Sequence, residues 1–386
     1  MNSETEIIKA QYKAFEFRGS SKEFFKIWIV NIALSVLTLG IYSAWAKVRT
    51  NRYIYGNTFI NGSNFEFNAN AKRILYGRLI VFAFYGLFLF ATDVIYNTTL
   101  ALGVAIVFLL LLPWLVRQAI SFRLKSASYR NVYFKYGAKS RSFYALALMF
   151  IGAIVLMLLP GILKGIFKDS ISSNLAGTLV FIFMLLFVVV IVPIFYKKLK
   201  ALIVDNSYYG KSKFNFSATN KSTIILFLKL ALVTTIITIL LVFIASVVVA
   251  MLSSYLNTMN IGNQFKGITT ATVIILLYVV PIAFYKGIID AFLSNFVRNN
   301  TSINECKFKG ELEAIDLGII SATNTLATIG SFGLAYPWAR VRYLKYKASN
   351  TYFLCDNYDK FISDGKDSSS TIGEETMDFF DIDIGV

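Results

Sequence analysis

The chain has 386 residues, of which 56% are hydrophobic and only 16% are charged, and its formal net charge is +16. Several apolar runs reach the roughly 18–20 residues that cross a bilayer as a helix. This composition excludes an ordinary soluble domain and predicts a polytopic membrane protein.

The chain contains no histidine and only two cysteines, Cys306 and Cys355. It therefore lacks the usual proton shuttle, the commonest zinc ligand and a disulfide framework. We expect the two cysteines to be reduced, half-buried thiols on the cytoplasmic side. The sequence shows no nucleophile arrangement, glycine-rich phosphate loop or metal-ligand spacing, so we expect no enzyme activity, no cofactor and no metal.

The segment from residue 31 to 60 occurs again, without a gap, at residues 324–353. The identical pairs are Asn31 and Asn324, Gly40 and Gly333, Trp45 and Trp338, Ala46 and Ala339, Val48 and Val341, Arg49 and Arg342, Tyr53 and Tyr346, Asn57 and Asn350, and Thr58 and Thr351. A repeat at both ends of a chain indicates an internally repeated architecture.

Each end segment is short. Phe15 and Trp45 are 30 residues apart, and two helices of about 12 residues reach only ~18 Å each, less than the ~30 Å hydrocarbon core. We therefore predict two re-entrant helical pairs that enter the membrane and return, with bends at residues 38–40 and 331–333. The alternative is one tilted crossing at residues 24–44 with an external N-terminus.

A shorter motif, two aromatic residues separated by one polar residue, marks the start of each repeat unit. It occurs at residues 15–17, 65–67, 134–136 and 214–216, with a weaker copy at residues 306–308. Alternation of apolar and polar residues is typical of a strand, and Asn61-Gly62 is a strong hairpin signal. We predict one short β-hairpin per unit, with the strand at 15–17 pairing with the strand near 350–353 to close a ring.

The three middle units each contain two long apolar runs. The runs cover about residues 74–96 and 99–121, 142–163 and 174–196, and 223–253 and 268–289. They predict six spanning helices in three hairpins. Lysine and arginine cluster beside the β-hairpins and are scarce in the intervening loops, which predicts that the β-hairpin layer and both termini are cytoplasmic.

The expected fold is an α-helical polytopic membrane protein with internal repeats: six spanning helices, two re-entrant pairs and a cytoplasmic layer of short β-hairpins. One integral membrane domain, residues 1–362, contains five units at about 15–64, 65–133, 134–213, 214–305 and 306–362. Residues 363–386 are expected to form a disordered acidic tail. From Asp356 onward nine acids stand against two lysines, a net charge of −7, so the rest of the chain carries +23.

Two asparagines lie inside apolar segments at matching positions of the long repeat. An unsatisfied amide in hydrocarbon is costly, so these amides either hold helices together or line a solute path. The candidate path residues are Asn31, Thr38, Gly40, Asn324, Ser331 and Gly333.

Two matched basic faces follow the bends. They contain Trp45, Lys47, Arg49 and Arg52, and Trp338, Arg340, Arg342 and Lys345. Either these residues snorkel beside an aromatic belt, or they form an anion or lipid-headgroup site where the chain ends meet. The expected partners are membrane lipids with anionic headgroups at the cytoplasmic face, and no nucleic acid.

Asp290 is one of the few acids near a membrane boundary, and Lys286 lies one helical turn before it. Two interpretations are open for this carboxylate. It is either half of an interfacial ion pair or a group that couples proton movement.

Three stretches resemble the YjgN family of bacterial inner-membrane proteins: FEFRGSSKEFFKIW, TLGIYSAWAKVRTNRYIYGNTF and FEFNANAKRILYGR. The resembling motifs are Phe-x-Phe-x-Gly, T-L-G-I-Y-x-x-W-A-x-V-R and a following N-T. The match is specific over residues 15–80 and is recognisable again over 306–353, where Pro337 replaces Ala44 and Gly330 replaces Leu37. The resemblance implies a multi-pass inner-membrane protein and transfers no activity, cofactor or catalytic residue.

The expected function is that of a channel or transporter whose path runs between the re-entrant pairs, with a basic cytoplasmic mouth for anionic solutes or lipid headgroups. The alternative is a non-transporting membrane scaffold that binds partners through its β-hairpins and acidic tail. A lipid-modifying enzyme is the third choice, weakened by the absence of histidine.

Overall fold

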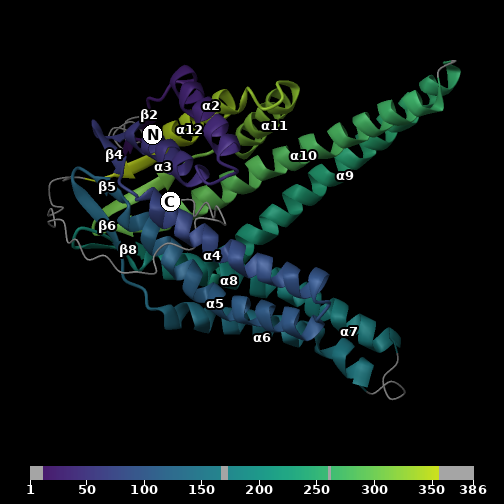
Figure 1. Ribbon diagram of the computed structural model, residues 1–386, viewed down its shortest axis with the longest axis horizontal. Helices are drawn as coiled ribbons and strands as arrows, with labels where there is room; N and C mark the ends of the chain where they lie inside the picture. The colour runs from purple at the N-terminus through teal and green to yellow at the C-terminus, as the bar shows by residue number, and fades with distance from the viewer. Residues whose placement is uncertain (1–11, 167–172, 260–261, 356–386) are drawn as a thin grey trace, which may run out of the picture.

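The computed structural model describes residues 12–166, 173–259 and 262–355. A layer of short strands lies at one end of the molecule, and the helices extend away from it (Figure 1). The predicted acidic tail, residues 363–386, lies outside the described residues.

The structure contains short strands and long helices that alternate along the chain. The strands are β1 (Tyr12–Ala14), β2 (Glu16–Phe17), β3 (Thr58–Ile60), β4 (Ser63–Phe67), β5 (Ala127–Tyr129), β6 (Val132–Tyr136), β7 (Ser207–Tyr209), β8 (Ser212–Phe216), β9 (Thr301–Ile303), β10 (Cys306–Gly310) and β11 (Thr351–Leu354). The helices are α2 (Ser21–Leu37), α3 (Ser43–Gly56), α4 (Ala71–Leu89), α5 (Thr98–Lys125), α6 (Ser140–Ile166), α7 (Ser173–Leu186), α8 (Val192–Val204), α9 (Asn220–Thr258), α10 (Asn263–Asn299), α11 (Ala314–Gly330) and α12 (Tyr336–Ser349), with π-helical turns η1 (Phe90–Val94) and η2 (Phe187–Ile191).

Within the described ranges, six helical segments are long and apolar enough to cross a membrane. They are Ala71–Val94, Thr98–Lys125, Ser140–Ile166, Asn174–Val204, Asn220–Thr258 and Asn263–Asn299. The structure therefore contains six candidate spans in three helical hairpins, as predicted. At most 22% of the apolar stretch of any of these segments is buried inside the protein, so most of each span is available to lipid.

The strands form one eleven-stranded antiparallel sheet that closes almost completely into a ring. Its order is β1-β11-β10-β9-β8-β7-β6-β5-β4-β3-β2, so the two ends of the sheet are the first two strands of the chain. Only Phe15 separates them, and its N–H donates to the carbonyl oxygen of Thr351 at 2.8 Å. The predicted layer of short β-hairpins in a ring is present, but the described strands form four hairpins, and β1 and β11 from the two end units pair in place of a fifth. The expected register is shifted, because Tyr12–Ala14 pairs with β11 while Glu16–Phe17 pairs with β3.

Aromatic side chains from different units pack together in the ring. Phe15 lies 6.1 Å from Phe65, Phe134 lies 6.4 Å from Phe214, and Phe214 lies 6.3 Å from Phe308, measured between ring centroids. The first four of these residues each open a sequence motif, so the alternation that predicted strands also sends one aromatic residue per unit into a shared core.

Two tyrosines complete this core between the second and third units. The Tyr129 hydroxyl donates to the Ile60 carbonyl at 2.8 Å, and the Tyr209 hydroxyl donates to the Tyr129 carbonyl at 2.9 Å. Burial raises the pKa of both hydroxyls above the usual value for tyrosine. Both therefore stay protonated at neutral pH and hold adjacent hairpins together.

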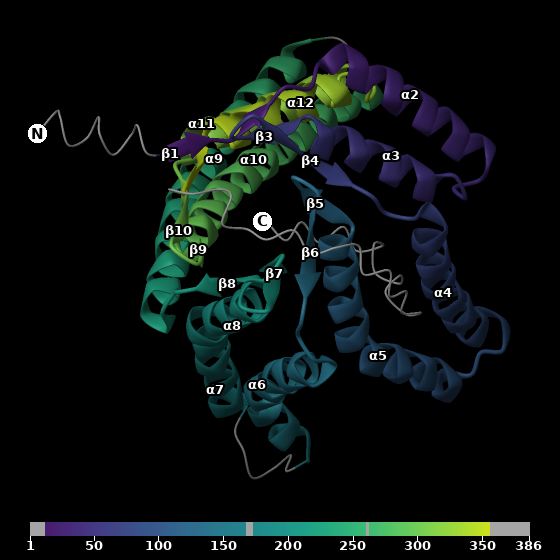
Figure 2. The same cartoon turned by 90° about the vertical axis from the view of Figure 1, so that its left-hand side faces the viewer.

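The helices follow the same circular order as the strands. Consecutive helices contact each other along the chain from α2 to α12, with η2 connecting α7 to α8, and α12 contacts α2, which closes the circuit (Figure 2). A close crossing joins α10 to α11 at Gly287, where a Cβ atom would lie 2.3 Å from the carbonyl oxygen of Leu317. Glycine at this position allows α11 to pack directly on α10.

The two end segments are helical hairpins that return to the sheet. Their bends share one backbone conformation, with φ values of 50° and 90° at Leu39 and Gly40 and of 52° and 92° at Phe332 and Gly333. The second φ value of each pair favours glycine. A single crossing over residues 24–44 is excluded, because the strands before and after the first hairpin, β2 and β3, pair with each other.

Cys306 and Cys355 lie at adjoining ends of β10 and β11 and form a disulfide bond. The expectation of two reduced thiols is therefore wrong. The sequence could not reveal the pairing, because it depends on two strands whose cysteines are 49 residues apart. The cross-link joins the residue after β11 to the start of β10, in the fourth hairpin of the ring, β9–β10.

Replacing both cysteines, Cys306→Ser with Cys355→Ser, should lower the free energy of unfolding by about 2–4 kcal/mol, because the cross-link restricts the unfolded chain. Thermal unfolding of the purified protein in detergent measures the change. A reductant should lower the melting temperature of the unchanged protein and leave that of the double variant unaltered. An unchanged protein that is insensitive to reductant would contradict the prediction.

Candidate functional site

The two repeated hairpins, α2–α3 and α11–α12, lie side by side because α2 packs against α12. The ring of Trp28 lies 6.1 Å from that of Tyr336, and buried Phe24 and Val341 share one apolar cluster with Tyr53. The first and last repeated segments therefore lie together in the structure, as predicted.

The tips of both hairpins are apolar and exposed. Leu39 is 95% exposed in one tip and Phe332 is 97% exposed in the other. The neighbouring exposed residues are Val36, Leu37, Ile41, Ile329 and Leu334. Apolar patches of this kind on a membrane protein indicate contact with lipid or with another protein.

The basic residues lie on the helices that lead from the tips back to the sheet. Neither α3 nor α12 contains an acidic residue, and Arg49, Arg52 and Lys345 are exposed. Two of the arginines cover aromatic rings: the Arg342 Cζ atom lies 5.4 Å from the centroid of Trp338, and the Arg340 Cζ atom lies 5.9 Å from that of Tyr343. The predicted basic faces therefore lie on neighbouring hairpins, one on each.

Asn31 and Asn324 make the same hydrogen bond in the two copies. The Asn31 Nδ2 donates to the Ala46 carbonyl at 3.2 Å, and the Asn324 Nδ2 donates to the Ala339 carbonyl at 2.9 Å. Each acceptor lies 15 residues after its asparagine. Each amide thus ties the two helices of its own hairpin together.

The hydroxyls at the bends are used locally as well. The Thr38 hydroxyl donates to the Leu34 carbonyl at 2.7 Å, and the Ser331 oxygen accepts from the Ala335 N–H at 2.8 Å. The residues predicted to line a solute path therefore hold the two hairpins in shape, each set within its own hairpin.

Sequence reasoning missed the partner that α12 supplies to Asp290. The carboxylate lies 3.1 Å from the Lys347 Nζ, accepts a hydrogen bond from the Tyr343 hydroxyl and accepts another from the Ser294 hydroxyl at 2.9 Å. The expected neighbour was Lys286, on the same helix. This network ties α12 to α10 and supports the ion-pair interpretation of Asp290.

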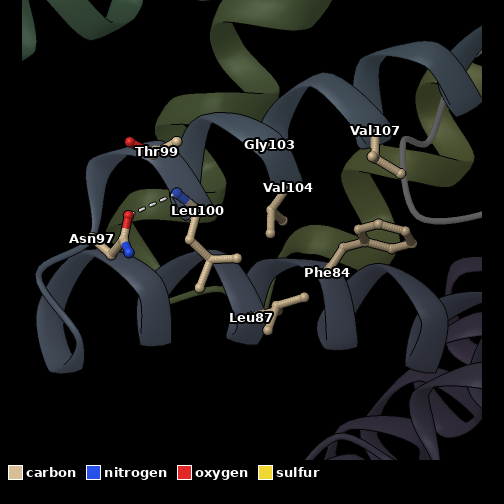
Figure 3. A pocket seen from close by; sticks show the side chains of 8 residues that line it. All are labelled: Phe84, Leu87, Asn97, Thr99, Leu100, Gly103, Val104 and Val107. Atoms are coloured by element: carbon tan, nitrogen blue, oxygen red, sulfur yellow. Dashed lines mark hydrogen bonds between the residues drawn. The ribbon is translucent and has the colours of Figure 1, made fainter.

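Two shallow grooves lie on the spanning hairpins, and both are mainly apolar. The first, of about 550 Å³, lies between α4 and α5 near their junction (Figure 3). Its most polar residue, Asn97, accepts a hydrogen bond from the Leu100 N–H at 3.0 Å and so caps α5. The second groove, of about 490 Å³, runs along α10 beside Tyr285 and Asp290. Across the described ranges, no cluster of side chains is suited to holding a metal ion.

Asn324→Ala should destabilise the protein more than Asn31→Ala. Both changes remove the bond to a helix carbonyl and one further contact of 3.3 Å, from the Asn31 Nδ2 to the Thr50 hydroxyl oxygen or from the Arg342 Nη1 to the Asn324 Oδ1. Asn31→Ala also removes a buried Oδ1 atom that accepts no hydrogen bond among the described residues, and losing this unsatisfied acceptor offsets part of the cost. We expect a loss of about 1–3 kcal/mol for Asn324→Ala, measured by thermal unfolding in detergent. Equal losses in the two variants would contradict this prediction.

Comparison with known proteins identifies the family. A family described as "Bacterial protein of unknown function (DUF898)" matches residues 12–379. The chain is 25% identical over 369 residues to a protein named "Inner membrane protein YjgN" from Escherichia coli strain K12, with 89% of each chain covered. It is 24% identical over 359 residues to a protein of the same name from Salmonella typhimurium strain LT2, with 87% of each covered.

No solved structure matches this chain. The names of the relatives and the six candidate spans agree with the multi-pass inner-membrane location that the sequence motifs implied. The resemblance to the YjgN family is confirmed, and the family match covers nearly the whole sequence. This chain belongs to the DUF898 family of bacterial proteins of unknown function.

Proposed function

We propose that this protein binds anionic phospholipid headgroups through α3 and α12 and holds the strand ring at the membrane surface as a scaffold. One observation carries the proposal. Each end hairpin combines an exposed apolar tip with a helix that is basic and free of acids. Such a hairpin suits a re-entrant position, in which the tip enters the acyl chains and the basic helix stays at headgroup level.

The dimensions support this position. Arg49 lies six residues beyond Ser43, and Arg342 lies six residues beyond Tyr336. At 1.5 Å per residue, both arginines are about 9 Å from the start of their helix. Amphipathic elements insert their apolar side about 5–10 Å into the boundary of headgroups and acyl chains. Trp45 and Trp338, one turn nearer the tips, then lie where aromatic belts form.

Two features bear on the side of the membrane that the sheet occupies. Basic residues concentrate beside the strands, which favours the cytoplasm. The disulfide between Cys306 and Cys355 is a kind of cross-link more common outside the cytoplasm. The charge bias recurs in every unit, whereas the disulfide is one pair, so our proposal places the strand ring in the cytoplasm.

The lipid prediction is tested by neutralising two exposed basic residues, one on each hairpin, in Arg49→Gln with Lys345→Gln. Each basic residue near an anionic surface contributes about 1 kcal/mol. The affinity for phosphatidylglycerol, measured by its retention in native mass spectrometry, should therefore fall roughly 30-fold. The matched control, Lys211→Gln with Lys213→Gln, removes the same charge from the β7–β8 hairpin. Equal losses in both variants would show that only net charge matters.

Cysteine labelling tests the re-entrant position. In the non-reduced protein, whose native cysteines are joined, we expect Leu39→Cys and Phe332→Cys to resist a membrane-impermeant maleimide applied from either side, because lipid covers the tips. Lys22→Cys, exposed near the sheet, should react from the cytoplasmic side alone. Labelling of the tips from the opposite side would contradict a re-entrant hairpin, and reaction of Lys22→Cys from the periplasm would reverse the orientation.

A second candidate function is passage of an anionic solute along the axis of the ring. The closed circuit of helices around the strands favours it. Against it, the Asn31 and Asn324 amides are engaged within their own hairpins, and aromatic residues pack together in the ring. A liposome flux that disappears when Asn31, Asn324, Arg49 and Arg342 are changed together, in a folded protein, would favour transport over the scaffold.

A further inference from the structure

The two repeated arginines occupy different environments although their helices correspond residue by residue. Arg342, in the second copy, is partly buried, whereas Arg49, in the first copy, is exposed. We infer that Arg49 is the phosphate ligand of the proposed headgroup site and that Arg342 is a structural residue. This inference rests on the proposed function and identifies which hairpin performs it.

In the second hairpin, two acceptors and one aromatic ring hold the guanidinium. The Arg342 Nη1 donates to the Thr323 hydroxyl oxygen at 2.7 Å and lies 3.3 Å from the Asn324 Oδ1. Its Cζ atom also lies 5.4 Å from the ring centroid of Trp338. Because all three partners belong to its own hairpin, this guanidinium is committed to connecting α12 with α11.

In the first hairpin, one of these acceptors is missing. Thr323 corresponds to Val30, which has no hydroxyl, while Asn324 corresponds to Asn31. Asn31 is 5% exposed, and no donor among the described residues reaches its Oδ1 atom. The first copy therefore keeps the asparagine and the arginine but does not join them.

The difference between valine and threonine explains why. A guanidinium becomes buried at low cost only where protein acceptors replace the hydrogen bonds that it makes to water or to lipid phosphate. Thr323 and Asn324 together supply two such acceptors, and Asn31 alone supplies one. Arg49 therefore stays exposed, where its planar donors can bind the two free oxygens of a phosphodiester.

The exposed tip beside Arg49 determines the kind of phosphate. Leu39 and Ile41 precede the basic helix and are exposed, so a ligand at Arg49 meets apolar surface on the tip side. A phospholipid satisfies both contacts, with its phosphate on Arg49 and its acyl chains beside the tip. A free phosphate satisfies only the first.

Exchanging the residue types at positions 30 and 323 tests the inference without changing any charge. Val30→Thr should give Arg49 its second acceptor, raise the melting temperature, and weaken phosphatidylglycerol binding in native mass spectrometry about three- to tenfold. Thr323→Val should release Arg342, lower the melting temperature, and strengthen binding by a similar factor. Val30→Thr with unchanged lipid binding would overturn the inference.

Single neutralisations separate this inference from the proposed function. Arg49→Gln should weaken binding about fivefold, whereas Arg342→Gln should change it less than twofold and lower the melting temperature. Equal weakening by the two variants would overturn the assignment of Arg49 and leave the headgroup proposal intact. If neither these variants nor Arg49→Gln with Lys345→Gln weakened binding, the proposed function itself would fail.

Chemical protection identifies the source of the phosphate. Phenylglyoxal modifies exposed arginines, so peptide mapping of the full chain in detergent should show Arg49 modified faster than Arg342. Phosphatidylglycerol should protect Arg49, and inorganic phosphate at the same concentration should not. Equal protection by both would replace the lipid with a free phosphate ion and overturn the inference.

Discussion

The backbone hydrogen bonds of the strand ring are the constraint on which the rest of the structure depends. An open sheet of eleven short strands would expose two edges of unpaired amide and carbonyl groups. The first extended segment removes both edges, because β1 pairs with β11 and β2 pairs with β3. The first and last units must therefore be neighbours, and the helices that leave the strands follow the same order.

Ring closure explains why the two repeated hairpins are neighbours. They are far apart in sequence, yet they lie side by side because the ring has no other place for them. Both have the hydrogen bond from the asparagine side chain that joins their two helices, and both have the same bend. They differ at many positions, one of which is Val30 in the first copy and Thr323 in the second, and only the threonine supplies a hydroxyl to the neighbouring arginine. The repeat thus gives two hairpins with one shape and different surfaces.

Much of the fold could be predicted because its signals are local. The apolar runs predicted the six candidate spans, since crossing a bilayer requires a long stretch with little charge. Alternation and the Asn61-Gly62 turn predicted strands and hairpins. The candidate site was predicted less well. The sequence could not decide whether Asn31 and Asn324 line a path or join helices, because an amide in an apolar helix suits both roles.

The sequence by itself determined the membrane class, the six candidate spans, the likeness of the two end segments and the proximity of the first and last segments. The reason is that the length of an apolar run and the likeness of two segments can both be read from the sequence, without knowing which residues meet in the fold. Only the tertiary structure decided the register of β1 against β11, the disulfide, and the pairing of Asp290 with Lys347. It also decided which arginine is held and which is exposed, because each of these contacts joins residues that only the folded ring and its hairpins bring within hydrogen-bonding distance.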